Sequence, residues 1–224
     1  MASTINSDTS NGLILTPDTT GEIELQSAGV TKAKITSSGL QNASGSANTS
    51  VGANDRVLLG QRFEGFNVQT LAKGTSAAKP VTLSFWVKSN KTGTYIVELF
   101  DSPNGRQISQ TYTISVADTW EKKTITIDGD TSGIINNDNG LGLLAKWWLA
   151  AGTSWSSGTL ATSWATLSNP NRVSSSNVNL ADSTSNYINI TGVQLEVGTT
   201  ATPFENLQYG QQLALCQRYF EVVI

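Results

Sequence analysis

The sequence contains no histidine among its 224 residues. Serine hydrolase triads, histidine-type zinc sites and most acid–base catalysis near neutral pH depend on an imidazole, so these chemistries are excluded. Carboxylates remain as candidate catalytic groups, namely Glu98, Asp101, Asp118, Glu121, Asp138 and Glu196. No two of them stand out as the facing pair that glycoside hydrolysis needs. We therefore expect solvated surface roles for these carboxylates, no catalytic residues, no enzymatic activity and no cofactor.

Cysteine and charge are also scarce. Cys216 is the only cysteine, which excludes internal disulfides, so stability must come from packing or subunit association. Only 14% of the residues are charged, and the net charge is −3. Lys and Arg form no cluster that could neutralise a row of phosphates, so nucleic acid is not an expected partner. No segment supplies the ~18 apolar residues of a membrane span, and membrane insertion is not expected either.

Ser, Thr, Asn and Gly are abundant, and apolar residues alternate with them at a period of two. This alternation is typical of strands with one buried face. The polar linker 88–93 predicts that strands 81–88 and 94–99 form a hairpin. Similar runs occur at 56–63, 108–114, 120–127, 141–149 and 187–197. Seven or eight such strands make the chain mainly β and favour an antiparallel jelly-roll β-sandwich over residues 53–206, with long loops at 151–185.

The first 45 residues predict a separate unit, a short β-meander with Ile23, Leu25 and Ile35 as its apolar side chains. A segment of this size rarely buries a core of its own. We therefore expect these side chains to pack against copies of the same segment or against another protein. Residues 46–52 are small and polar, as in a flexible linker.

The C-terminal segment 207–224 predicts one short helix. Tyr209, Leu213, Cys216 and Phe220 recur at steps of three and four, which places them on one stripe. A helix of this length is marginal in water unless its apolar stripe is covered. We expect Leu213, Cys216 and Phe220 to pack on the sandwich or on a neighbouring subunit, with Cys216 as a small buried hydrophobe rather than a nucleophile.

A long motif lies near the C-terminus. It reads ITGVQLEVG from Ile190 to Gly198, ATPFE from Ala201 to Glu205 and LALCQRYF from Leu213 to Phe220. It resembles a stretch of phage tail-fibre and minor virion proteins, in which a jelly-roll domain ends in such a strand and helix. Residues 83–89 and 119–121 resemble earlier strands of the same domain, and the first forty residues resemble the meander repeats of trimeric fibre shafts.

The resemblance implies a homotrimeric structural or attachment component of a phage virion, with residues 1–45 as its virion-docking or trimerising meander. The protein would be a tail fibre, a head fibre or a capsid decoration that contacts other virion proteins, with a host surface glycan as a candidate ligand. The alternative from another functional class is a carbohydrate-binding module or a glycan-active enzyme.

Two kinds of candidate binding residue follow from the sequence. Trp155 and Trp164 in polar loops, and Trp86 on the strand face opposite Phe85, could stack on sugar rings, although burial in the core or in an interface is the other interpretation. Asp128 and Asp130 begin a segment like a calcium loop. Because the flanking helices and the final glutamate of such a loop are missing, a plain polar turn without metal is the interpretation we favour.

Overall fold

The structure is a computed structural model. It describes residues 47–217 and, before them, the backbone of six short strands. These strands are β1 (Ser3–Thr4), β2 (Asn6–Asp8), β3 (Gly12–Ile14), β4 (Ile23–Ser27), β5 (Val30–Thr36) and β6 (Gly39–Asn42).

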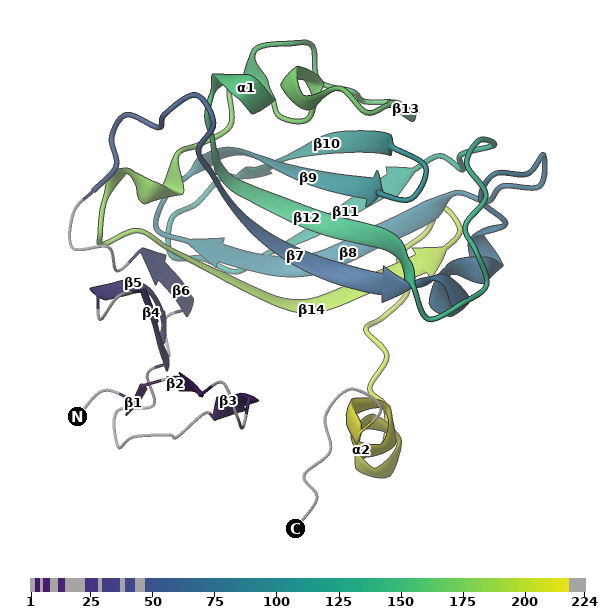
Figure 1. Ribbon diagram of the computed structural model, residues 1–224, viewed down its shortest axis with the longest axis horizontal. Helices are drawn as coiled ribbons and strands as arrows, with labels where there is room; N and C mark the ends of the chain where they lie inside the picture. Colours follow the sequence, from purple (N-terminus) through teal and green to yellow (C-terminus); the bar gives the residue numbers. More distant parts are fainter. Residues whose placement is uncertain are drawn as a thin grey trace.

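Two sheets face each other across the core (Figure 1). The first, sheet I, has the order β1-β4-β5-β6-β14-β8-β11 and includes β8 (Val81–Ser89), β11 (Glu121–Ile127) and β14 (Tyr187–Val197). The second, sheet II, has the order β13-β10-β9-β12-β7. Its strands are β7 (Arg56–Glu64), β9 (Gly93–Asp101), β10 (Arg106–Ile114), β12 (Leu141–Ala151) and β13 (Ala165–Thr166).

The connections between the sheets are those of a jelly roll. Within the described part of the chain, eight antiparallel strands form the sandwich, as β6-β14-β8-β11 facing β7-β12-β9-β10. Among these eight strands the chain changes sheets at every step except between β9 and β10, which pair as a hairpin. The prediction of a mainly β, antiparallel jelly-roll sandwich is confirmed.

The predicted hairpin between β8 and β9 is wrong, because the two strands lie in different sheets. Their linker is a corner rather than a hairpin loop. The Ser89 hydroxyl donates to the Tyr187 carbonyl at 2.6 Å, and the Tyr95 hydroxyl donates to the Lys91 carbonyl at 2.8 Å. Six polar residues are enough to cross between packed sheets, which lie ~10 Å apart, so linker composition alone could not separate the two arrangements.

Aromatic side chains fill the core between the sheets. Phe85 of β8 contacts Tyr112 and Trp147 edge to face, with ring centroids 5.2 and 5.6 Å apart. Tyr95 stacks on Tyr112 at 5.5 Å. The inward residues of β8 and β9 are buried here as predicted, but β9 is buried on its other face as well, since Ile96 and Glu98 are also inaccessible.

The outer face of sheet II is covered in part by the chain after β12. This covering segment contains the short helix α1 (Thr153–Ser156) and the 3-10 turns η2 (Asn169–Asn171) and η3 (Leu180–Asp182). It buries a second apolar cluster around Ile96, Trp148 and Val173. A further 3-10 helix, η1 (Gly65–Leu71), follows β7. Strand β12 is therefore buried on both faces, which explains why Trp147 and Trp148 are adjacent yet both inaccessible.

The N-terminal strands continue sheet I. β4 pairs with β5, placing Ile23 opposite Ile35, and β6 joins β14 through Leu40 and Gln41. The first jelly-roll strand thus comes from the segment 1–45, while the division of the chain at 45 stays a prediction. Packing of the Ile23, Leu25 and Ile35 side chains lies outside the described residues. In the segment expected as a linker, Asn48 exchanges hydrogen bonds with Ala181 and Asn179.

The C-terminal helix α2 (Tyr209–Gln217) has no buried residue within the described chain. Leu213 is 42% exposed and Cys216 is exposed, so the single chain does not provide the expected cover on the sandwich. Cover by a neighbouring subunit stays a prediction, and Phe220 lies outside the described residues. No described helix is long and apolar enough to cross a membrane.

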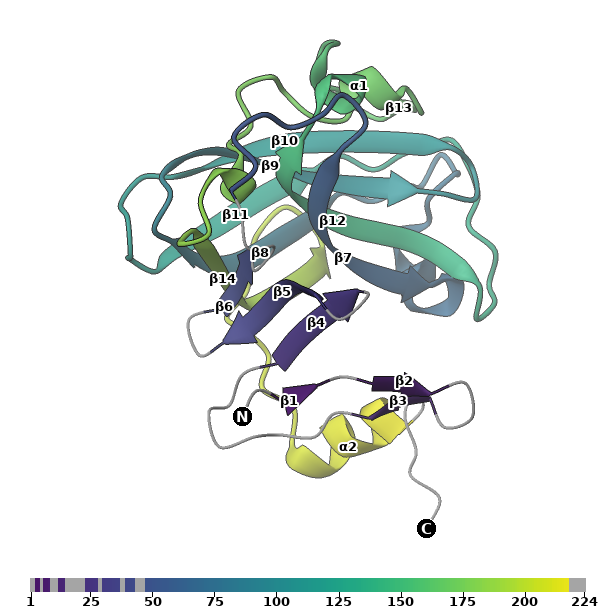
Figure 2. The ribbon, with the colours of Figure 1, turned by 60° about the vertical axis from the view of Figure 1, so that its left-hand side comes forward.

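The described terminal segments lie on one side of the molecule. Strands β1 to β5 and helix α2 lie on that side, whereas α1 and β13 lie on the opposite side (Figures 1 and 2). The molecule therefore has one side built from its terminal segments and another built from the covering segment.

Candidate functional site

Charged residues lie on the outer face of sheet II, opposite the aromatic core. Glu98 of β9 and Lys146 of β12 are direct register partners. Their inward neighbours Val97 and Trp147 fill the core, so the period of two turns Glu98 and Lys146 outward. Arg172, from the covering segment just after η2, lies over them. Three charges from distant parts of the sequence thus meet at one place.

Glu98 is fully buried and fully engaged. Arg172 donates to its two carboxylate oxygens, from Nε at 2.8 Å and from Nη2 at 3.0 Å. The indole N–H of Trp148 donates to the same carboxylate at 2.9 Å. Bidentate, charge-assisted hydrogen bonds of this kind are among the strongest polar contacts in proteins. They fix the covering segment to sheet II.

Lys146 is buried but has much weaker partners. Its Nζ lies 3.9 Å from the Glu98 carboxylate and 3.9 Å from the centroid of the Phe100 ring. Burial lowers the pKa of Lys146 from 10.5 to about 8, and the nearby Arg172 and Arg56 act in the same direction although Glu98 opposes them. A buried ammonium with one distant counter-ion is costly unless something else compensates it.

Arg56 completes the group from the first residue of β7. Its guanidinium lies over the Trp155 ring, with Cζ 4.4 Å from the centroid, and Trp155 in turn packs on Trp148 at 5.8 Å. Within the described residues no carboxylate lies within salt-bridge range of Arg56. The arginine is positioned by an aromatic face and keeps its charge available.

These residues line an open cavity of about 480 Å³, which we name the cationic pocket. Its lining is Arg56, Val57, Leu58, Lys146, Trp148, Trp155 and Arg172. Three cations face it and the single buried Glu98 neutralises one of them, so its local charge is positive in a chain whose net charge is −3. The pocket has the size of a small-molecule site and the electrostatics of an anion site.

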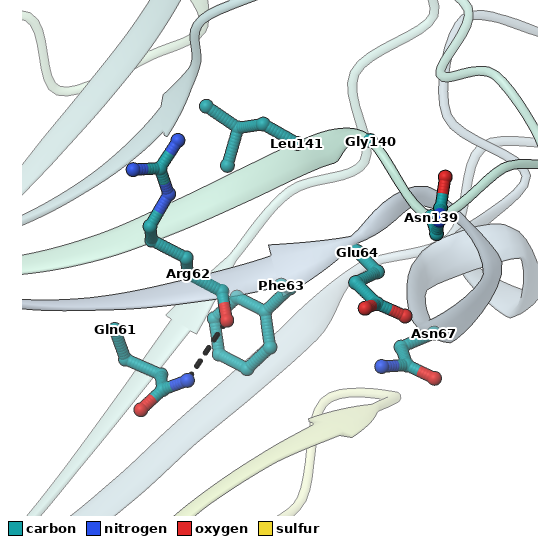
Figure 3. Close-up of a pocket in the computed structure, with 8 residues that line it drawn as sticks. All are labelled: Gln61, Arg62, Phe63, Glu64, Asn67, Asn139, Gly140 and Leu141. Carbon is teal, nitrogen blue, oxygen red and sulfur yellow. Dashed lines mark hydrogen bonds between the residues drawn. The ribbon is translucent and has the colours of Figure 1, made fainter. Parts of the chain in front are cut away.

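A second cavity of about 470 Å³ lies further along the same strands, where β7 meets η1 (Figure 3). Arg62 and Phe63 project to opposite sides of β7, and the Gln61 amide donates to the Arg62 carbonyl at 2.8 Å. Glu64 and Asn67 line its other end. This cavity combines one cation with one acid and lacks the buried, underpaired charge of the cationic pocket.

The three tryptophans proposed from the sequence do not form one surface. The face of Trp155 carries Arg56, and its N–H donates to the Asn54 carbonyl at 3.2 Å. Trp164 donates to the Asp128 carbonyl at 2.8 Å and faces Lys73. Trp86 is 42% exposed but lies on the outer face of sheet I, the side of the terminal segments. Trp155 alone lies in a charged pocket, where it orients an arginine.

The segment considered for calcium is held by cations of the chain itself. Asp130 accepts two hydrogen bonds from Arg106, at 2.5 and 2.8 Å, and lies 3.1 Å from the Lys73 ammonium. Burial would raise the pKa of Asp130, but the hydrogen bonds from Arg106, Ser132 and Lys73 outweigh it and lower the pKa. Asp128 is exposed. Among the described residues no group of three or more His, Cys, Asp or Glu side chains could hold a metal.

The expectation of surface roles is wrong for two of the carboxylates. Glu98 and Asp101 are both fully buried, Glu98 under Arg172 and Asp101 in a salt bridge with Lys73. Glu121 binds the backbone N–H groups of Ser115 and Val116 and pairs with Lys123. Each of these carboxylates holds a corner or a loop in place.

Comparisons with known proteins add no relative. No family model matches the chain. Searches of curated proteins and of solved structures also found no match. The site is therefore interpreted from its own geometry.

Reasoning from the sequence missed Arg56, Lys146 and Arg172. One signal was present, because Lys146 interrupts an otherwise apolar run from Leu141 to Ala151. A charge inside a strand buried on both faces needs a partner, and that requirement could have marked the position. Nothing in the sequence indicated that Arg172, 26 residues later, would be near it.

Proposed function

We propose that this protein is a structural and attachment component of a phage virion that docks through its terminal segments and presents the opposite side outward. The motif ITGVQLEVG–ATPFE–LALCQRYF and the jelly roll support this proposal together. The structural observation that most supports it is the exposed apolar surface of α2, which lies on the same side of the molecule as β1 to β5.

This docking side includes large apolar residues that are exposed. Leu213 and Leu215 of α2 are 42% and 56% exposed, and Phe204 in the segment before the helix is 49% exposed. Such residues, clustered at one end of a molecule, are typical of interaction sites. A second edge is also available, since β14 pairs with β6 only at Tyr187 and Ile188. The occupant we propose is a further copy of this chain, in a homotrimer.

The trimer is tested by light scattering of the purified full-length protein. We expect about three times the 23.8 kDa of one chain. Leu213→Asp should shift the mass toward the monomer, because it places a charge in the proposed interface, while Ser163→Asp, at an exposed position of the covering segment on the opposite side, should not. A wild-type monomer at high concentration would contradict the proposal.

Docking is tested separately by deletion. Removal of residues 1–36 keeps β6 and should leave a folded sandwich that no longer enters the particle. Normal incorporation of this truncated protein would place the docking function elsewhere in the chain.

The alternative is a carbohydrate-binding module, and the cationic pocket favours it as a second candidate. A module of this kind would bind glycan as a monomer and without other virion proteins. Mass and glycan binding measured on the same preparation separate the two candidates.

A further inference from the structure

We propose that the cationic pocket binds an acidic glycan, with a sugar carboxylate lying between Arg56 and Lys146. This inference rests on the proposed attachment function and names the ligand class that the outward side would recognise. The sequence pointed to tryptophan stacking on sugars, whereas the pocket points to recognition of a charge.

The first argument is charge that the chain leaves uncompensated. Glu98 is satisfied by Arg172 and Trp148, and it reaches Lys146 only at 3.9 Å. Arg56 has no acidic partner among the described residues. Two cations therefore face one cavity: Lys146 is buried with the distant Glu98 as its counter-ion, which is unfavourable, and Arg56 is exposed to solvent. A bound carboxylate would supply the missing partner for both.

The second argument is that the pocket is built before ligand arrives. Trp155 holds Arg56 by its ring face, and Trp155 is held by Trp148 and by the Asn54 carbonyl. Lys146 is fixed over Phe100 on a central strand. Positioned cations lose little conformational entropy when an anion binds, which favours binding.

The third argument concerns the shape of the ligand. Between Arg56 and Arg62 the outward residue of β7 that pairs with Lys146 is Gly60, where an added Cβ would meet the Ala145 carbonyl, Leu58 and Lys146 at 3.8–3.9 Å. Leu58 lies on the same face between Gly60 and Arg56 and lines the pocket. With no side chain at Gly60 and an apolar one at Leu58, this part of the strand suits the apolar face of one sugar ring beside the two cations.

The local nature of the charge favours a glycan over nucleic acid. A phosphate backbone is held by rows of cations, and binding grows with the number of phosphates neutralised. Here one compact group of cations lies in a chain with a net charge of −3. Apolar and aromatic walls from Leu58, Trp148 and Trp155 accompany the cations. This mixture suits a single carboxylate on a partly apolar sugar ring.

The test is calorimetric titration of the full-length protein with two acidic trisaccharides, trigalacturonate and an α2,8-linked sialic acid trimer. The methyl ester of each, which carries no carboxylate charge, is titrated for comparison. We expect at least one acid to bind about tenfold or more tightly than its ester, as loss of a charge-assisted contact predicts. Inorganic phosphate serves as the probe for an unspecific anion site.

Matched variants locate the binding. Arg56→Gln should weaken binding of the acidic trisaccharide by about tenfold, whereas Arg62→Gln, on the same exposed face of β7 but outside the pocket, should change it by less than about twofold. Binding to the wild type should fall above pH 8, because Lys146, which faces the charges of Glu98, Arg172 and Arg56, then loses its proton. Lys146→Met should bind weakly and without this pH dependence.

Three outcomes would overturn the inference. Equal binding of acid and ester in both pairs would show that the carboxylate is not recognised. An effect of Arg62→Gln equal to that of Arg56→Gln would show that binding does not take place in the cationic pocket. Competition by phosphate with the affinity of the sugar would show that the site binds anions without recognising a glycan. A trimer that enters particles normally but shows one of these outcomes would leave the attachment proposal standing. A monomer that binds the acidic sugar would support the inference about the pocket and contradict the proposed trimer.

Discussion

Arg172 donates two hydrogen bonds to the buried carboxylate of Glu98, across 74 residues of sequence. This pair joins the segment after β12 to the outer face of sheet II, and it creates the wall of the cationic pocket. The same contact therefore serves the fold and the candidate site. Its removal should lower both the stability of the fold and ligand binding in the pocket.

Arg172→Met should destabilise the protein by about 3–5 kcal/mol, because it leaves Glu98 buried without its main partner. The double variant Glu98→Gln/Arg172→Met should lose less than Arg172→Met alone, since the unpaired carboxylate is gone and only Lys146 loses a counter-ion, which lies at 3.9 Å in the wild type. Urea unfolding followed by tryptophan fluorescence measures both. Arg62→Gln, exposed on the same sheet, is the control and should stay within about 0.5 kcal/mol of the wild type. An equal loss in the single and double variants would show that packing, not charge, dominates.

Lys146 should make stability depend on pH in the alkaline range. Its pKa is about 8 in the folded protein and 10.5 as the ordinary value, so between these pH values the unfolded chain binds more protons. Below pH 8 the buried charge of Lys146 destabilises the folded protein to its full extent. As pH increases from 8 to 10.5 this destabilisation disappears, so the free energy of unfolding rises. We expect Lys146→Met to be as stable as the wild type or more so at pH 7, with the difference shrinking toward pH 10. Thermal melts at both pH values check this, and a difference that grows with pH would contradict it.

Two core tyrosines offer a matched comparison. The Tyr112 hydroxyl is buried without a hydrogen-bond partner, and burial raises its pKa well above 10. Tyr112→Phe should therefore be neutral or stabilising, whereas Tyr95→Phe loses the bond to the Lys91 carbonyl and should cost about 1 kcal/mol. Denaturation midpoints of the two variants give the answer. A larger loss for Tyr112→Phe would reveal a partner for its hydroxyl.

Helix α2 should affect assembly more than the fold of one chain. Leu213 is 42% exposed, so Leu213→Ala should change unfolding of the dissociated chain by less than about 1 kcal/mol. In the proposed trimer the same change removes a buried side chain and should cost about 2–5 kcal/mol per chain. Melting at several protein concentrations separates the two, because only the assembled form melts at a temperature that depends on concentration. Equal melting of Leu213→Ala and wild type at every concentration would show that α2 is not in an interface.

The sequence by itself determined the class of the fold. Alternation around Phe85 and Ile127 is enough to predict strands with an apolar face toward the core, because the side chains of a strand point to its two faces in turn. The absence of histidine and the single cysteine likewise bounded the chemistry without any structure. The strand from Tyr187 to Val197 was predicted with the bounds that the structure has.

Only the tertiary structure decided which strands pair and which charges meet. The six-residue polar linker 88–93 is compatible with a hairpin and with a corner between sheets, and the choice depends on the sheet that β9 joins. Glu98 and Lys146 appear in the sequence as ordinary charges on strands. Arg172 becomes their neighbour only because the segment after β12 folds back over sheet II. The candidate site is therefore a product of long-range packing, which local sequence patterns do not encode.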